Sequence, residues 1–339
     1  MREAMFWEKA GEGRVRCGLC RFHCLIGSGK RGRCGVRENR DGSLYSLVYG
    51  KCVAENVDPI EKKPLFHVHP GSHSYSIATV GCNFRCRHCQ NYQIAQWPHE
   101  REGIPGTDRT PAAIVAAAAE SGCATIAYTY TEPTIFFEYA YDTAVLARRH
   151  GIKNVFVTNG YTSTAALEAI APHLDAANVD LKAFSEKFYR EVAGATLAGV
   201  LDCLRDYRRL GIWLEVTTLL IPGWNDDEGE LRQLAEFLVR ELGREVPWHV
   251  SAFHPTYRML DRPPTSAASL GRAAAIGREA GLCYVYVGNL PLAGGEDTLC
   301  PHCGSVVIRR RGFRLAEMAL RGNCCRHCGG GIAGIGLDG

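Results

Sequence analysis

The chain has 339 residues, 46% of them hydrophobic and 22% charged, values near the globular average that exclude a disordered chain. No apolar run reaches the roughly 18 residues of a membrane span, and the charged start does not resemble a signal peptide. We therefore expect a cytoplasmic protein without a membrane partner. The net charge of +3 is too small for this length to indicate binding to DNA or RNA by itself.

Sixteen cysteines stand out in this composition. Disulfides are disfavoured in a reducing compartment, so this number indicates metal binding. Most of the cysteines fall into three sets by spacing. We expect four parts along the chain: a Cys-rich module over 1–57, a connector over 58–74, a central α/β domain over 75–295 and a second Cys-rich module over 296–339.

The first set comprises Cys17, Cys20, Cys24 and Cys34. Four thiolates this close in sequence can close a single site, and the glycines among them let the backbone turn sharply. Zinc and iron–sulfur clusters both accept four cysteines. We favour zinc or another closed structural site, and an auxiliary iron–sulfur cluster is the alternative.

The connector has prolines near both ends and mixed charge, so we expect it to cross to the mouth of the central domain. Beyond it, strand-like and helix-like segments alternate about every 30 residues, which indicates βα units. The expected strands are 75–80, 124–130, 154–158, 178–181, 213–220, 248–253 and 284–287. The expected helices are 111–120, 135–150, 163–173, 198–210, 227–242 and 266–280. Glycines that follow four of these helices predict left-handed caps: Gly122, Gly151, Gly211 and Gly281.

Just after the first expected strand, Cys82, Cys86 and Cys89 follow one another at C-x3-C-x2-C spacing. A [4Fe-4S] cube has four irons and is normally held by four cysteines, so three ligands leave one iron open. An open position on a metal admits another molecule, as it does in catalytic zinc sites. The alternative is a zinc knuckle with His88 as its fourth ligand.

The spacing resembles the cluster motif of the radical S-adenosylmethionine (SAM) superfamily, in which the residue before the last cysteine is often aromatic. Parallel strands with right-handed crossovers form a doubly wound sheet or a barrel, and the resemblance favours a partial (β/α)6 radical SAM barrel with small Cys-rich metal-binding modules at both termini. It implies a [4Fe-4S] cluster that cleaves SAM reductively to a 5'-deoxyadenosyl radical, which takes hydrogen from a substrate. It also implies an electron donor such as a flavodoxin or ferredoxin.

A segment after the second expected strand resembles the glycine-glycine-glutamate-proline segment of this superfamily, which binds the SAM amino group. Glu132 and Pro133 remain, whereas Tyr130 and Thr131 replace the glycines. A carboxylate suits an ammonium group. The alternative is a glutamate that caps the following helix.

Residues after three further strands also resemble SAM-binding positions. Thr158 and Asn159 match the Thr-Asn-Gly of the pyruvate formate-lyase activating enzymes. Asp180 and Lys182 match the Asp-x-Lys of that group, which implies a ribose hydroxyl or cation for the aspartate and the SAM carboxylate for the lysine. His254 matches a histidine that reaches SAM.

The last cysteine set forms two C-x2-C-G knuckles, made by Cys300 with Cys303 and by Cys325 with Cys328. We expect a zinc-ribbon or rubredoxin-like site that holds zinc, with Cys324 as a bystander, because iron there would need a redox use. Four arginines lie between the knuckles: Arg309, Arg310, Arg311 and Arg314. They suggest RNA binding, but no stacking aromatics apart from Phe313 are interleaved with them, so we expect a solvated hairpin face. The tail over 329–339 offers nothing to pack.

Over nearly its full length the chain resembles the radical SAM enzymes of the AmmeMemoRadiSam system, which are related to pyruvate formate-lyase activating enzymes. The motifs do not fix the substrate, which is a protein, peptide, small molecule or RNA. An activase that forms a glycyl radical on a partner protein is one alternative. A non-catalytic protein that binds zinc at all three cysteine sets is the other.

Overall fold

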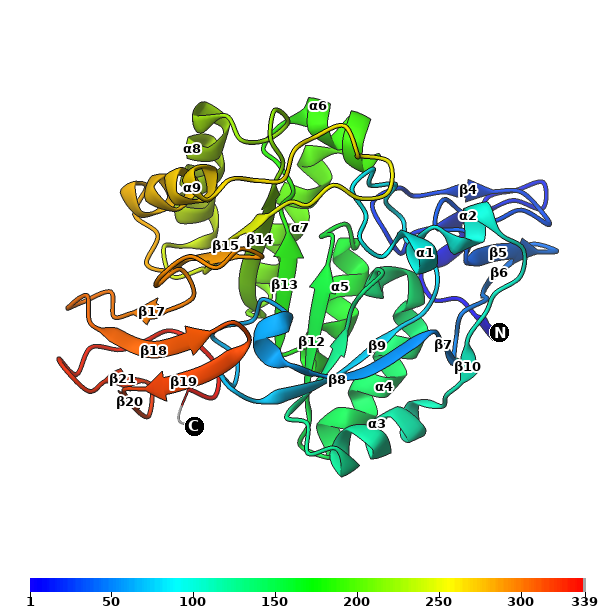
Figure 1. Cartoon of the computed structure of the whole chain (residues 1–339). Coiled ribbons are helices and arrows are strands. Elements are labelled where there is room, and N and C mark those ends of the chain that lie inside the picture. Colours follow the sequence, from blue (N-terminus) through cyan, green and yellow to red (C-terminus); the bar gives the residue numbers. More distant parts are fainter. Residues whose placement is uncertain (338–339) are drawn as a thin grey trace.

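The computed structural model describes residues 1–337 and has an eight-stranded sheet at its centre (Figure 1). The strand order is β16-β15-β14-β13-β12-β11-β9-β8. All neighbours pair in parallel except β8 (Ala54–Pro59), which is antiparallel to β9. The parallel strands are β9 (His73–Ala78), β11 (Thr125–Tyr128), β12 (Lys153–Thr158), β13 (Ala176–Asp180), β14 (Trp213–Leu220), β15 (Trp248–Ala252) and β16 (Val285–Gly288).

The expected α/β class with a central parallel sheet is confirmed, and every expected strand is present. These strands are short and mostly buried, as β11 is at every residue, because parallel strands are covered on both faces. The sheet has one more parallel strand than the six βα units of the implied barrel. The sequence analysis does not predict β8, whose residues are divided between the expected N-terminal module and the expected connector. The expected boundary between residues 57 and 58 falls inside this strand.

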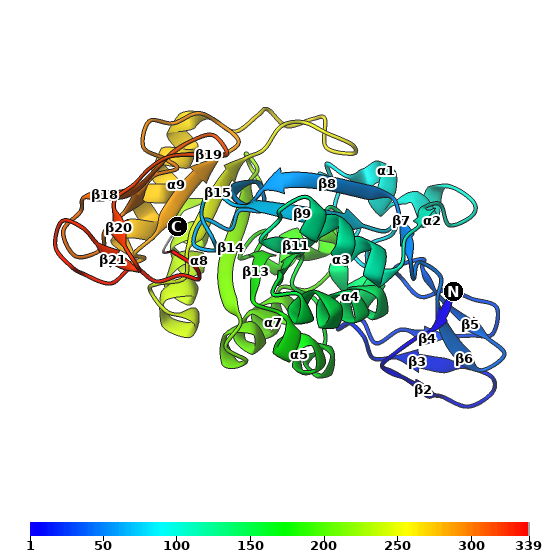
Figure 2. The same ribbon diagram turned by 90° about the horizontal axis from the view of Figure 1, so that it is seen from below.

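Helices connect the parallel strands and cover the outer side of the sheet (Figure 2). They are α3 (Pro111–Glu120), α4 (Phe137–Arg149), α5 (Thr164–Ile170), α7 (Leu197–Arg209), α8 (Glu228–Phe237) and α9 (Ala267–Glu279), and all six were expected. Short turns extend three of them: η2 (Pro133–Phe136), η3 (Ala171–His173) and η5 (Leu238–Leu242). Side-chain oxygens accept a backbone N–H at five helix starts, from Thr110, Ser163, Thr196, Asp227 and Ser266. The four glycines expected to follow helices all have positive φ.

The connector lies at the amino ends of the parallel strands, so the expectation that it crosses to the mouth is wrong. The backbone N–H groups of Phe66 and His67 donate to the Glu215 carboxylate in β14, at 3.0 and 2.8 Å. Glu215 is fully buried and also lies 2.7 Å from His249 Nε2. A buried carboxylate needs several donors, and the backbone of the connector supplies two of them.

The C-terminal module packs on the connector through Arg310 of β18 (Val306–Arg311), which pairs with β19 (Arg314–Met318). Arg310 Nη2 donates to Phe66 O at 2.7 Å, and its guanidinium lies 4.3 Å from the centre of the Phe66 ring. Its Nε is 3.6 Å from Glu61 Oε1. Arg309, Arg311 and Arg314 are exposed, as expected, but the prediction for Arg310 is wrong. This arginine is buried because it bonds the connector.

The tail also packs, contrary to expectation, as far as residue 337. Val68 forms a parallel bridge with Ile335, and His67 Nδ1 lies 2.6 Å from Ala333 O. Ile332 and Leu337 are buried. The last two residues of the expected tail, 338–339, lie outside the described residues. The short strands β17 (Thr298–Leu299), β20 (Leu320–Arg321) and β21 (Cys324–Cys325) complete this module.

The N-terminal module lies on the opposite side of the barrel from the C-terminal module (Figure 1). Its strands are β1 (Arg2–Glu3), β2 (Trp7–Lys9), β3 (Val15–Cys17), β4 (Leu25–Ile26), β5 (Arg37–Arg40), β6 (Ser43–Ser46) and β7 (Lys51–Cys52). Arg37 forms a buried ion pair with Glu138 of α4 at 2.7 Å. Arg21 pairs with Asp206 of α7 at the same distance. Two barrel helices therefore anchor the module. No helix within residues 1–337 is long and apolar enough to cross a membrane.

We predict that Glu215→Ala destabilises the protein by about 3 kcal/mol, because it leaves buried donors of the connector unpaired. Denaturant unfolding at constant metal content measures the change. Glu236→Ala is the control, because this exposed glutamate pairs with the exposed Arg240 and should contribute less than about 0.5 kcal/mol. Equal effects of the two substitutions would show that Glu215 does not hold the connector.

Candidate active site and metal centres

The loop that carries Cys82, Cys86 and Cys89 follows β9 and precedes α1 (Tyr92–Ala95). Its backbone is fixed by neighbours on two sides. Arg85 N donates to Ala193 O at 2.8 Å and Arg87 N donates to Val192 O at 2.9 Å, both in the π-helical turn η4 (Tyr189–Ala193). At Gly81, which has φ +101°, a Cβ atom would lie only 3.1 Å from Cys34 O. The loop is thus held between η4 and the N-terminal module.

The three thiols of this loop are suited to metal binding. Cys82 and Cys86 are buried and Cys89 is partly buried. Burial raises the pKa of all three, that of Cys89 to about 12, although the charge of Lys182 lowers the pKa of Cys86 in part. The thiols are therefore protonated without metal, and a bound metal would displace the protons and stabilise the thiolates.

The geometry does not favour the zinc-knuckle alternative. Within residues 1–337, the sulfurs of this loop and the His88 ring do not converge to the spacing that one ion requires. The His88 ring centre lies 6.0 Å from that of Phe188, and burial lowers the pKa of His88 to about 3. His88 thus packs as a neutral aromatic ring. On a cube each cysteine binds a separate iron, so its ligands need not converge on a point.

Three residues predicted to bind SAM form one hydrogen-bonded network. Glu132 is fully buried, and its Oε1 accepts from Thr158 Oγ1 at 2.8 Å and from the backbone and side chain of Thr134. Its Oε2 accepts from Asn159 N at 2.8 Å. Burial raises the pKa of Glu132, and these hydrogen bonds oppose the shift. The carboxylate also caps η2, so the capping role proposed as the alternative is present.

Asn159 connects this network to the cysteine loop. Its Nδ2 donates to Asn83 Oδ1 at 2.7 Å and lies 3.7 Å from Cys82 Sγ. Phe84 N points to the same sulfur at 3.4 Å. Donors of this kind stabilise a ligating thiolate. Sequence reasoning missed Asn83, although its place directly after the first cysteine was a usable signal.

Asp180 is the last residue of β13 and Lys182 follows it, and the two pair with each other, with Lys182 Nζ 2.7 Å from Asp180 Oδ2. Burial lowers the pKa of Lys182, but the charges of Asp180 and Cys86 outweigh it and the net pKa is raised. The lysine is therefore cationic and its charge acts on Cys86. The structure places this predicted pair next to the cysteine loop.

His254 stands apart from the other predicted SAM residues. It is exposed, and its Nε2 lies 3.4 Å from Asn289 O. His254 begins a segment that we call the strap (residues 254–265). The strap reaches the cysteine loop (Figure 1). Arg258 N donates to Arg87 O at 3.0 Å, and the Tyr257 ring stacks on Tyr92 with centres 4.5 Å apart. The strap therefore covers part of the barrel mouth.

Tyr130, which replaces a family glycine, keeps the backbone conformation that favours glycine, with φ +60°. Its ring is held inside the barrel, where its hydroxyl donates to Asp58 and Lys63 Nζ lies 4.6 Å from the ring centre. Burial raises the pKa of Tyr130 to about 12. These contacts with the connector stabilise a conformation that is costly for tyrosine. No local sequence pattern predicts these contacts.

The last cysteine set converges on one point. The sulfurs of Cys300, Cys303, Cys325 and Cys328 lie within 4.8 Å of one another. Two of the separations are 3.6 Å, between Cys300 and Cys328, and 3.8 Å, between Cys303 and Cys325. Tetrahedral zinc with Zn–S bonds of about 2.3 Å places its sulfurs about 3.8 Å apart. The four residues thus fit a single zinc ion, and Cys324 is not among them.

The first cysteine set lines one internal cavity between the N-terminal module and the barrel. Cys17 and Cys34 are buried, and Cys20 and Cys24 are partly buried. In the described part of the chain these sulfurs do not converge as the C-terminal ones do.

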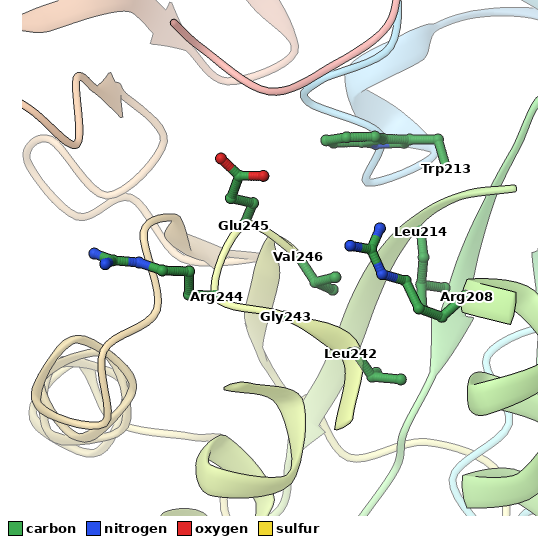
Figure 3. Close-up of a pocket in the computed structure, with 8 residues that line it drawn as sticks. All are labelled: Arg208, Trp213, Leu214, Leu242, Gly243, Arg244, Glu245 and Val246. Carbon is green, nitrogen blue, oxygen red and sulfur yellow. The ribbon is translucent and has the colours of Figure 1, made fainter. Parts of the chain in front are cut away.

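A further pocket lies at the other end of the barrel (Figure 3). It is formed by Arg208, by Trp213 at the start of β14 and by the loop that contains Glu245. Because parallel strands present their carboxyl ends at one edge, this pocket is remote from the cysteine loop. None of the predicted site residues lines it.

Comparisons with known proteins agree with the geometry. Residues 76–235 match the radical SAM superfamily. An uncharacterised protein of Methanocaldococcus jannaschii is 46% identical over 331 residues, which cover 97% of this chain and 98% of that protein. The isethionate sulfite-lyase activating enzyme of Nitratidesulfovibrio vulgaris is 32% identical over 135 residues, 38% of this chain and 43% of that enzyme. The chain therefore belongs to the radical SAM superfamily, whose members are enzymes and use a [4Fe-4S] cluster and SAM.

Solved structures show the same fold. SuiB of Streptococcus suis, bound to its precursor peptide SuiA, aligns with a TM-score of 0.51 at 14% identity. The alignment covers 69% of this chain and 52% of SuiB. At this identity the likeness concerns the fold alone.

We predict that Cys303→Ala removes about one zinc per chain, because three thiolates no longer complete the tetrahedral site. Elemental analysis of the purified protein measures the loss. Cys324→Ala is the matched control, because this neighbouring cysteine is outside the converging set. Loss of zinc from both variants, or from neither, would contradict the ligand assignment.

Proposed function

We propose that this chain is a radical SAM enzyme that cleaves SAM reductively and abstracts hydrogen from a substrate that is not yet identified. The observation that carries the proposal is the position of the three-cysteine loop beside the network of Glu132, Thr158 and Asn159. When bound, the cluster supplies one electron to SAM, and the 5'-deoxyadenosyl radical that results takes hydrogen from the substrate. The protein has to position the cofactor against its target and exclude water.

Lys182 and Asp180 are suited to the polar groups of SAM. Lys182 is cationic and mostly buried, with 13% of its side chain exposed, so it can pair with the SAM carboxylate. Asp180 is more exposed, at 35%, and can accept a ribose hydroxyl. The role of Asn159 is to orient Cys82, through the contacts of its amide with Asn83 and with the sulfur.

For Glu132 to bind the SAM amino group, a neighbouring group has to move. Its Oε2 accepts one hydrogen bond from the protein, so it has capacity for an ammonium donor. However, the side chain is fully buried, and a neighbour would have to shift for SAM to reach it. We retain the role as part of the proposal, together with the approach of His254 from the strap.

The reaction needs one electron from outside the chain. We propose a cytoplasmic flavodoxin or ferredoxin as its source, since these are one-electron carriers. We also propose that the C-terminal module binds zinc, which has a structural role. The resemblance over nearly the full length supports membership of the AmmeMemoRadiSam system. Co-purification with other members of that system would test this.

Of the alternatives, the glycyl-radical activase is supported by the match to an isethionate sulfite-lyase activating enzyme, which spans 38% of this chain. An activase must admit a protein loop at the barrel mouth. The contacts of the strap with Arg87 and Tyr92 narrow that mouth and favour a smaller substrate or a peptide. The multi-zinc scaffold is not favoured, since only the C-terminal set within residues 1–337 has single-ion spacing.

The test is anaerobic reconstitution with iron and sulfide, followed by assay for 5'-deoxyadenosine from SAM and a reductant. We predict that Cys86→Ala abolishes product formation, because a required cluster ligand is lost. Cys123→Ala is the control, because Cys123 is buried outside all three sets. SAM cleavage by the Cys86→Ala protein at the wild-type rate would refute the proposal.

We predict that Lys182→Gln weakens SAM binding about tenfold, equivalent to about 1.4 kcal/mol, because a partly buried charge pair is lost. Calorimetry on the reconstituted protein measures the dissociation constant. Lys187→Gln serves as the control, because this nearby lysine is exposed. Unchanged affinity in Lys182→Gln would remove the lysine from the site.

A further inference from the structure

The first cysteine set differs from the last one in its geometry. The four sulfurs of the C-terminal set converge within 4.8 Å, as one zinc ion requires, whereas those of Cys17, Cys20, Cys24 and Cys34 do not, within the described residues. Instead they line one pocket between the N-terminal module and the barrel. A cube binds each thiolate at a separate iron corner, so its four ligands stand further apart than those of one ion. The arrangement therefore fits a cluster better than zinc.

A buried arginine faces the same cavity. Arg37 lines it and is 1% exposed. Its Nη2 donates to Met5 O at 2.6 Å and to Glu138 Oε1 at 2.7 Å. Its Nε and Nη1 have no hydrogen-bond partner among the described residues. A buried donor without a partner is costly, so such a group calls for an acceptor at the site.

The cavity also adjoins the central cysteine loop. Asn83, which follows Cys82, lines it. The close approach of Gly81 to Cys34 O brings the two cysteine sets together at a second point. Ile135, in the turn η2 that follows Glu132, forms part of the wall.

We propose that Cys17, Cys20, Cys24 and Cys34 hold a second [4Fe-4S] cluster, and that the free N–H groups of Arg37 donate to its sulfurs. Four thiolates on a cube carry net negative charge in a buried space, and the guanidinium offsets it. Asn83 then lies between the second cluster and Cys82. This site goes beyond the proposed SAM chemistry and depends on different residues.

The test uses the full-length chain with Cys82, Cys86 and Cys89 all replaced by alanine, purified and reconstituted without oxygen. We expect about four irons and four sulfides per chain to remain, with the absorption and EPR signals of a reducible cluster. Adding Cys20→Ala should remove this iron, whereas adding Cys203→Ala, at a buried cysteine outside the sets, should not. Loss of all iron from the triple variant, with a second zinc bound, would overturn the proposal.

The measurement separates this proposal from the previous one. If the wild-type protein fails to cleave SAM but the triple variant retains its iron, the second cluster stands and the proposed function falls. If SAM is cleaved but the triple variant holds no iron, the reverse is true.

The part played by Arg37 is tested by Arg37→Lys, which keeps a positive charge for Glu138 but removes the planar donors. We expect the iron content to be unchanged and the reduction potential of the N-terminal cluster to fall, because fewer hydrogen bonds reach its sulfurs. An EPR-monitored redox titration measures the potential. Arg40→Lys, at an exposed site in the same module, is the control. An unchanged potential in Arg37→Lys would remove Arg37 from the site.

Discussion

The in-register pairing of parallel strands is the constraint on which this structure depends. It places the carboxyl ends of β9, β11, β12 and β13 at one edge of the sheet, so four loops far apart in sequence meet there. The cysteines, the buried carboxylate of Glu132 and the cationic Lys182 are neighbours for this reason alone. Their hydrogen bonds then fix the details, as when Asn159 contacts both Glu132 and Cys82.

The two ends of the barrel differ in how fully their buried polar groups are hydrogen-bonded. At the carboxyl end, buried polar groups retain unused capacity, as the amide nitrogen of Asn83 does. At the amino end, Glu215 gathers donors from the connector, from β14 and from β15, which closes the base of the barrel. A polar network that is satisfied by the protein itself stabilises the fold, whereas one with spare donors and acceptors can take a ligand.

Much of the fold could be predicted because its signals are local. Periodicity located the strands and helices, and cysteine spacing separated the C-terminal ligands from Cys324. The missed features depend on contacts between distant segments. The antiparallel pairing of β8, the burial of Arg310 under the connector and the positive φ of Tyr130 each need a partner that no short window contains. The distances that separate a cluster site from a single-ion site likewise exist only in the folded chain.

The bond between His67 and Ala333 joins residues that are 266 positions apart. Contacts of such long range form slowly, because a large loop must close first. During synthesis, the strands of the barrel and the connector leave the ribosome before the tail segment that packs on the connector. The contacts of the tail therefore form after the base of the barrel has been closed around Glu215.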